Sequence, residues 1–123
     1  MSLRLLLVTA LLLASSVARA EMVVCHVDYG GETRRIEARP TSTPLAVPTV
    51  QIGSYFLFRV VFEARTAIKT YIYADQEDGP LPLHQAVFPY PVPKTRGRPG
   101  FSGLHFVYEP IRDGELEFWC ELR

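Results

Sequence analysis

The sequence has no asparagine and very little lysine, and it carries no excess of charge. Without asparagine it contains no acceptor for N-linked glycosylation. Arginine outnumbers lysine by eleven to two, a bias that often reflects a GC-rich genome and therefore favours a bacterial source. The 13 basic and 13 acidic residues balance, so the composition gives no electrostatic reason to expect binding to nucleic acid or to a membrane surface.

Only one long apolar run is present, and it lies near the amino terminus. Leu5–Ala14 is uninterrupted by charge, follows a basic residue and precedes Ala18-Arg19-Ala20, the small-x-small pattern that signal peptidases cleave. The run is too short for a membrane span, which needs about 20 residues. We therefore predict a signal peptide over residues 1–20 and a single mature domain over residues 21–123, in the bacterial periplasm or secreted. The alternative is an uncleaved membrane anchor.

Cysteine is scarce, with one residue near each end of the predicted mature chain. Cys25 and Cys120 form no Cys-x-x-Cys pair, so a redox role is not indicated. In an oxidising compartment, two cysteines in a small domain are most simply one structural disulfide. On the chain-entropy model a cross-link over such a long loop stabilises by ~4–5 kcal/mol.

Helical periodicity is also missing, and apolar residues alternate with polar ones along most of the chain. This pattern predicts strands. The seven expected segments are residues 22–29, 32–39, 54–64, 66–74, 83–90, 103–109 and 115–122. Residues 32–39 are highly charged and are expected to form an edge strand. The fold prediction is all-β: a small antiparallel two-sheet sandwich of immunoglobulin-like architecture, with about seven strands and one disulfide. A closed barrel is the alternative.

Prolines interrupt two further segments. Pro40, Pro44 and Pro48 predict extended, irregular chain without helix over residues 41–49. Residues 88–101 form a proline-rich, basic connection, and five of its residues are candidates for binding. These are Tyr90, Lys94, Arg96, Arg98 and Phe101. The segment could grip an anionic surface or an extended partner chain, or it could simply be a long connection.

The last two predicted strands place a tryptophan on the outer face of the fold. A turn over residues 110–114 sets His105 opposite Trp119, and Trp119 alternates with core residues along its strand. If the first strand runs beside the last, with Cys25 near Cys120, His26 also falls next to Trp119. The predicted candidate binding face is therefore the row of His26, Trp119 and His105. One alternative is that Trp119 packs under the proline-rich loop. Another is that the disulfide joins the two sheets, in which case His26 would not lie next to Trp119 and the row would not form.

The histidines raise the question of a metal site. His26 and His105 in one row could bind copper or zinc. Closely spaced histidine motifs are absent, and scattered surface histidines are the alternative. The sequence carries no nucleophile motif and no other enzyme signature. We expect a non-enzymatic, exported binding module with an unknown periplasmic protein or ligand as partner; the alternative function is periplasmic copper or zinc binding.

Overall fold

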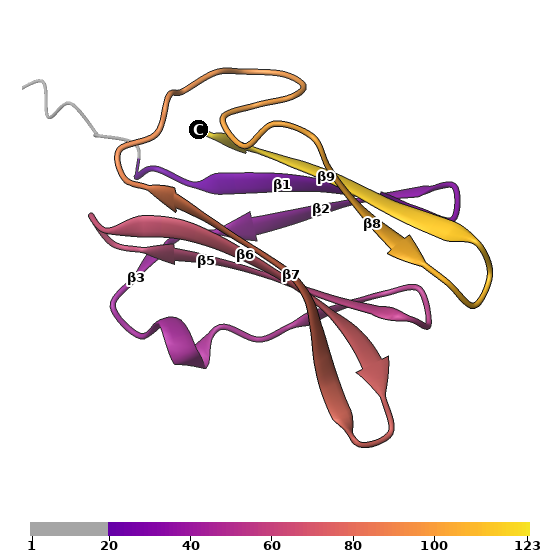
Figure 1. Cartoon of the computed structure of the whole chain (residues 1–123). Coiled ribbons are helices and arrows are strands. Elements are labelled where there is room, and N and C mark those ends of the chain that lie inside the picture. Colours follow the sequence, from indigo (N-terminus) through magenta and orange to yellow (C-terminus); the bar gives the residue numbers. More distant parts are fainter. Residues whose placement is uncertain (1–19) are drawn as a thin grey trace, which may run out of the picture.

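The computed structural model describes residues 20–123, and two β-sheets account for most of them (Figure 1). The predicted signal peptide lies outside the described residues except for Ala20. Within the described part, no helix has both the length and the apolar character needed to cross a membrane.

Strands from the two ends of the chain form the first sheet, in the order β2-β1-β9-β8 with every neighbouring pair antiparallel. Its strands are β1 (Val23–Tyr29), β2 (Glu32–Ala38), β8 (His105–Glu109) and β9 (Gly114–Leu122). The highly charged β2 is an edge strand, as its sequence predicts.

The middle of the chain forms the second sheet, which has the order β3-β5-β6-β7 with the short β4 also paired to β5. Its strands are β3 (Pro40–Thr41), β4 (Val50–Ile52), β5 (Phe56–Glu63), β6 (Ala67–Gln76) and β7 (Gly79–Pro89). All pairs are antiparallel except β3 with β5. Figure 1 shows the hairpin of β6 and β7 reaching away from the body of the sandwich.

The prediction of a small all-β sandwich is confirmed, with two differences. Residues 20–123 form nine strands rather than about seven, because β3 and β4 are too short to carry a recognisable period. One turn of 3₁₀ helix, η2 (Pro44–Ala46), lies where the sequence predicted no helix. Proline is compatible with the first position of a helical turn, where its missing N–H costs nothing.

Phenylalanines from both sheets fill the space between them. Phe56, Phe58 and Phe62 on β5 are almost fully buried, as their alternation predicts. Phe58 meets Phe118 of the facing sheet edge-on, with ring centroids 5.3 Å apart. Such contacts between large apolar side chains supply most of the favourable free energy of folding.

The predicted disulfide is formed and lies within the first sheet. Cys25 on β1 is directly opposite Cys120 on β9, with Cα atoms 4.0 Å apart, and both residues are fully buried. The bond therefore fastens two neighbouring strands rather than the two sheets. As a result β1 and β9 run side by side, which is the arrangement required for His26 to approach Trp119.

Candidate functional site

His26 and Trp119 lie together on the outer face of the first sheet, as predicted. They are directly opposite each other on β1 and β9. Their rings stack with centroids 4.1 Å apart and an interplanar angle of 16°. Nε2 of His26 is buried without a hydrogen-bond partner and lies 3.9 Å from Oε1 of Glu121.

The predicted position of His105 is wrong by one residue. His105 pairs with Phe118, not with Trp119, because the strands close around a four-residue turn. A shift of one residue moves a side chain to the opposite face of a sheet. His105 consequently points between the sheets and stacks on Phe118 at a centroid distance of 4.8 Å.

The row of three rings is therefore not formed, and the predicted metal pair is separated. His26 lies on the outer face of the sheet and His105 on its inner face, so they cannot ligate one copper or zinc ion. Among residues 20–123 no group of three or more histidine, cysteine or acidic side chains is arranged to hold a metal.

The actual neighbour of His105 is His84 of β7, for which no sequence pattern indicated a role. The two rings meet edge to face with centroids 5.2 Å apart. Burial lowers the pKa of His84, and the charge of His105 lowers it further. This pair is wedged between the two sheets where β7 and β8 approach each other, and its rings serve the core rather than a surface.

The proline-rich loop runs over the first sheet near the carboxyl end of β9 (Figure 1). Its glycines carry the contact: the Gly97 N–H donates to Oε2 of Glu121 at 3.1 Å, and Gly100 forms a bridge with Cys120. The close approach requires glycine, since a Cβ on Gly100 would lie 2.0 Å from the Cys120 carbonyl oxygen and 3.1 Å from the ring of Trp119. Trp119 is consequently half-buried, which matches the alternative in which it packs under the loop.

The five candidate loop residues have different surroundings. The aromatic ones, Tyr90 and Phe101, pack against the core. Among the basic ones, Lys94 lies 3.7 Å from Glu21, and Arg98 pairs with Glu117. Arg96 alone has no ion-pair or hydrogen-bond partner within the described chain. Whether these residues bind a ligand stays a prediction.

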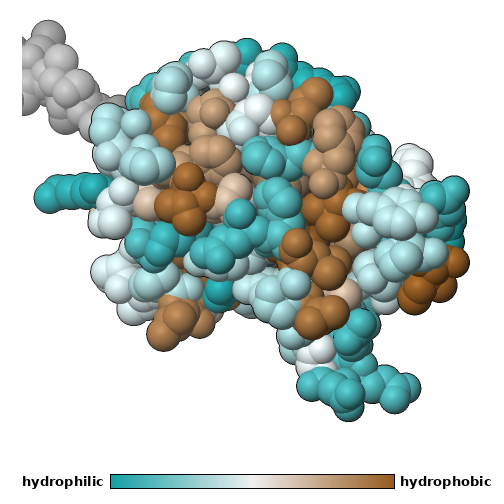
Figure 2. All heavy atoms as spheres, in the orientation of Figure 1, coloured by the Kyte–Doolittle hydropathy of each residue, from teal (hydrophilic) through white to brown (hydrophobic). Residues whose placement is uncertain are grey.

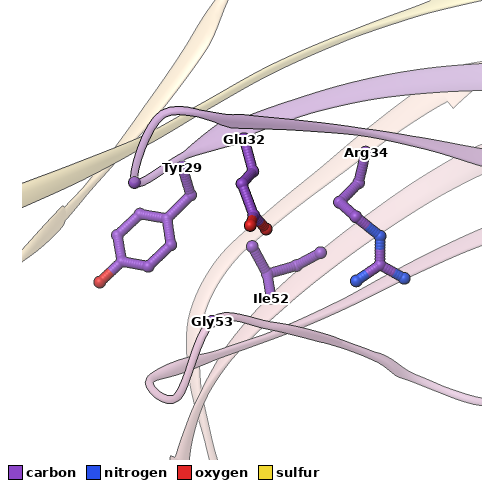
Figure 3. Close-up of a pocket in the computed structure, with 6 residues that line it drawn as sticks. Tyr29, Glu32, Arg34, Ile52 and Gly53 are labelled. Atoms are coloured by element: carbon purple, nitrogen blue, oxygen red, sulfur yellow. The ribbon is translucent and has the colours of Figure 1, made fainter.

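A crevice of about 220 Å³ opens at one end of the sandwich, between the β1–β2 turn and the end of β4 (Figure 3). Its lining residues are Tyr29, Gly30, Glu32, Arg34, Ile52 and Gly53. The Tyr29 hydroxyl is already engaged, since it donates to Glu109 at 2.7 Å, and this bond raises the pKa of Tyr29. Arg34 donates to the carbonyl of Gln51 at 3.2 Å. The crevice is small, and its donors are largely used within the protein.

A second feature is a set of exposed apolar side chains on and near β7 and β8. Seven of the eight large apolar side chains that the described chain exposes belong to these strands or their flanks, and the eighth is Leu45. The seven are Leu81, Leu83, Val87, Leu104, Phe106, Tyr108 and Ile111. Figure 2 shows apolar side chains gathered on the side of the molecule where β7 and β8 run. We call these seven residues the apolar strip.

Acidic residues border the apolar strip at both ends. The exposed tip of the β6–β7 hairpin carries Asp75, Glu77 and Asp78, and the turn after β8 leads to Asp113 and Glu115. Neither β7 nor β8 contains lysine or arginine. Acidic residues thus predominate at the two ends of the apolar strip, although Arg112 lies beside Asp113 and Lys69 is the cross-strand neighbour of Val87. Comparison of the chain with protein-family models, curated proteins and solved structures gives no match.

Proposed function

We propose that this protein is an exported, non-enzymatic binding module that takes up an extended segment of a partner protein along β8. The observation that carries the proposal is the apolar strip, since exposed apolar side chains gathered on one side of a protein often mark interaction sites. The disulfide supports export, because structural disulfides persist in oxidising compartments.

The apolar side chains lie beside a strand edge that has no partner in the described chain. β8 ends the first sheet, so alternate N–H and C=O groups of His105–Glu109 are not paired with another strand. Such an edge can accept an added strand through main-chain hydrogen bonds. Phe106 and Tyr108 stand on the outer face of β8 with 51% and 56% exposure, and they would contact alternate side chains of the added segment.

β7 is the less receptive of the two edges. It contains Pro80, Pro82 and Pro89, and proline lacks the N–H that an added strand requires. β8 contains no proline. The added segment therefore pairs with β8 rather than with β7.

The chemistry of the partner segment follows from the border of the strip. Apolar side chains on one face would cover Phe106 and Tyr108. Basic side chains would meet the acidic residues around the strip, including Asp113 and Glu115. The expected partner segment is thus an extended stretch in which apolar residues alternate with lysine or arginine.

Synthetic peptides of about ten residues test this proposal. One alternates valine with lysine and another alternates valine with glutamate, and fluorescence anisotropy measures their binding to the oxidised protein. The valine–lysine peptide should bind, and Phe106→Lys should weaken it at least tenfold, roughly 1.4 kcal/mol. Leu45→Lys is the matched control, because Leu45 is 92% exposed but lies outside the strip.

Three outcomes would contradict the proposal. The valine–glutamate peptide could bind equally well, or Leu45→Lys could cost as much as Phe106→Lys. Sedimentation could also show a dimer that Phe106→Lys dissociates, in which case a second copy of the chain occupies β8.

A further inference from the structure

Four arginines converge on one pocket at the opposite end of the first sheet from the β1–β2 turn. The pocket has a volume of about 420 Å³ and is lined by Met22, Arg35, Arg39, Arg96 and Arg123, together with Ala20, a residue that cleavage of the predicted signal peptide would remove. Arg35 belongs to β2 and Arg39 follows it, Arg96 comes from the proline-rich loop, and Arg123 follows β9. The chain as a whole carries no excess of positive charge, so this gathering is local.

Two of these arginines are paired and two are not. Arg35 lies 3.0 Å from Glu37, and Arg123 pairs with Glu121. Neither Arg39 nor Arg96 has an ion-pair partner among residues 20–123. The side chains around the pocket therefore leave two positive charges without a counter-charge.

The surroundings hold the pocket in place before any ligand arrives. Its floor is fixed by Met22 and Arg123, whose main chains exchange two hydrogen bonds of 2.8 Å. The loop segment that carries Arg96 is tied down by the bond from the Gly97 N–H to Glu121, a carboxylate that is only 2% exposed. The backbone next to Arg96 is thus fixed before a ligand arrives, which reduces the ordering that binding requires.

We infer that this arginine pocket binds a phosphate group carried as a monoester. A phosphomonoester has a charge between about −1.5 and −2 at neutral pH, which matches the two unpaired guanidinium groups. Guanidinium groups also present paired donors that fit phosphate oxygens in a bidentate manner. The phosphate could belong to a soluble compound or to the headgroup of a lipid, and both present the same group to the pocket.

Isothermal titration of the oxidised protein with phenyl phosphate at low ionic strength and about pH 7.5 tests the inference. Binding should saturate with a Kd below about 1 mM, and Arg39→Gln and Arg96→Gln should each weaken it about tenfold. Arg98→Gln is the matched control, since Arg98 is in the same loop but pairs with Glu117. A phosphodiester with a single charge, dimethyl phosphate, should bind more weakly.

Binding to lipid vesicles distinguishes the two sources of the phosphate. Phosphatidic acid in phosphatidylcholine vesicles presents the monoester on a lipid, and pure phosphatidylcholine vesicles are the blank. The inference is supported if Arg96→Gln weakens the binding of either probe. Binding of phenyl phosphate indicates a soluble source, and binding of the phosphatidic acid vesicles alone indicates a lipid source.

The inference is overturned if neither probe binds up to about 10 mM phosphate, or if Arg98→Gln weakens binding as much as Arg96→Gln. Arg96 is exposed, and its replacement should leave the thermal midpoint unchanged, which shows that the variant is folded. Because the pocket shares no residue with the apolar strip, Phe106→Lys should leave phosphate binding intact. Failure of one proposal is thereby distinguishable from failure of the other.

Discussion

At the scale of single residues, Glu121 organises the outer face of the first sheet. It accepts hydrogen bonds from Gly97 and from Arg123, and it lies close to His26. Burial tends to raise the pKa of Glu121, but the hydrogen bonds from Arg123 and Gly97 and the charges of Arg123 and His26 outweigh it, so its pKa is lowered overall. The carboxylate is therefore stabilised in its charged form by the folded protein.

Replacing Glu121 with glutamine should lower stability in a pH-dependent way. The variant keeps the shape of the side chain but loses its charge, and we expect a loss of about 2 kcal/mol at neutral pH. Because the folded pKa is below the unfolded one, the stabilisation is present above the ordinary carboxyl range and disappears as the pH falls through the folded pKa. Urea unfolding at about pH 7 and about pH 3 should show the difference shrinking on acidification. An equal loss at both values would contradict this account.

How far the site could be predicted is clearest for the aromatic residues. The contact of His26 with Trp119 followed from placing the two cysteines side by side, since that pairing fixes the register of β1 and β9. His105 was misplaced because the sequence does not specify whether a turn has four or five residues, and one residue reverses the face. Burial of Glu121 could not be predicted either, because it depends on the loop that covers it.

At the scale of elements, the proline-rich loop depends on one close approach. Gly97 and Gly100 both have positive φ angles, of 76° and 64°, but only Gly100 is crowded. A Cβ at Gly97 would meet nothing within 4 Å. The two positions thus have the same backbone preference and different surroundings.

Alanine at these two glycines should separate backbone strain from contact. Gly97→Ala bears only the conformational cost of about 1 kcal/mol. Gly100→Ala bears that cost and also drives the loop away from Cys120, so it should be clearly more destabilising and should expose Trp119. Thermal melts and the wavelength of Trp119 fluorescence measure the two effects. Equal behaviour of the two variants would mean that the loop does not rest on the sheet.

The strands were predictable where one face alone is buried. β5 and β9 follow their alternating patterns closely, because every second side chain enters the core. β7 begins at Gly79, earlier than the sequence indicates, and runs through Pro80 and Pro82. An edge strand tolerates proline on its free side, whereas proline in a sequence ordinarily argues against a strand. The segment from Gly79 to Pro82 lacks the charges that identify β2 as an edge strand, so this extension was missed.

At the scale of the whole molecule, one covalent bond joins the two ends of the described fold. The disulfide closes a sequence separation of 95 residues. Reduction, or the double replacement Cys25→Ala and Cys120→Ala, should lower the free energy of unfolding by ~4–5 kcal/mol on the chain-entropy model. Urea unfolding of the oxidised and reduced forms measures the change. Coincident curves would show that the bond contributes nothing to stability.

Both proposed binding surfaces are formed by residues that lie far apart in the sequence and come together only in the folded molecule. The arginine pocket draws residues from β2, from the proline-rich loop and from the end of β9. The apolar strip requires β7 and β8 to lie at neighbouring edges of different sheets. No local pattern in the sequence announces either surface, because each is assembled by topology.

Hydrogen exchange at β8 distinguishes strand addition from any other way of binding the peptide. In the free protein, the amides of His105–Glu109 that point away from β9 should exchange quickly, since no strand covers them. Addition of the valine–lysine peptide should slow these amides, while the exposed backbone around Leu45 stays unchanged. If the peptide binds and the outward amides of β8 keep exchanging at their free rate, the segment does not add to β8 and the proposed function is wrong.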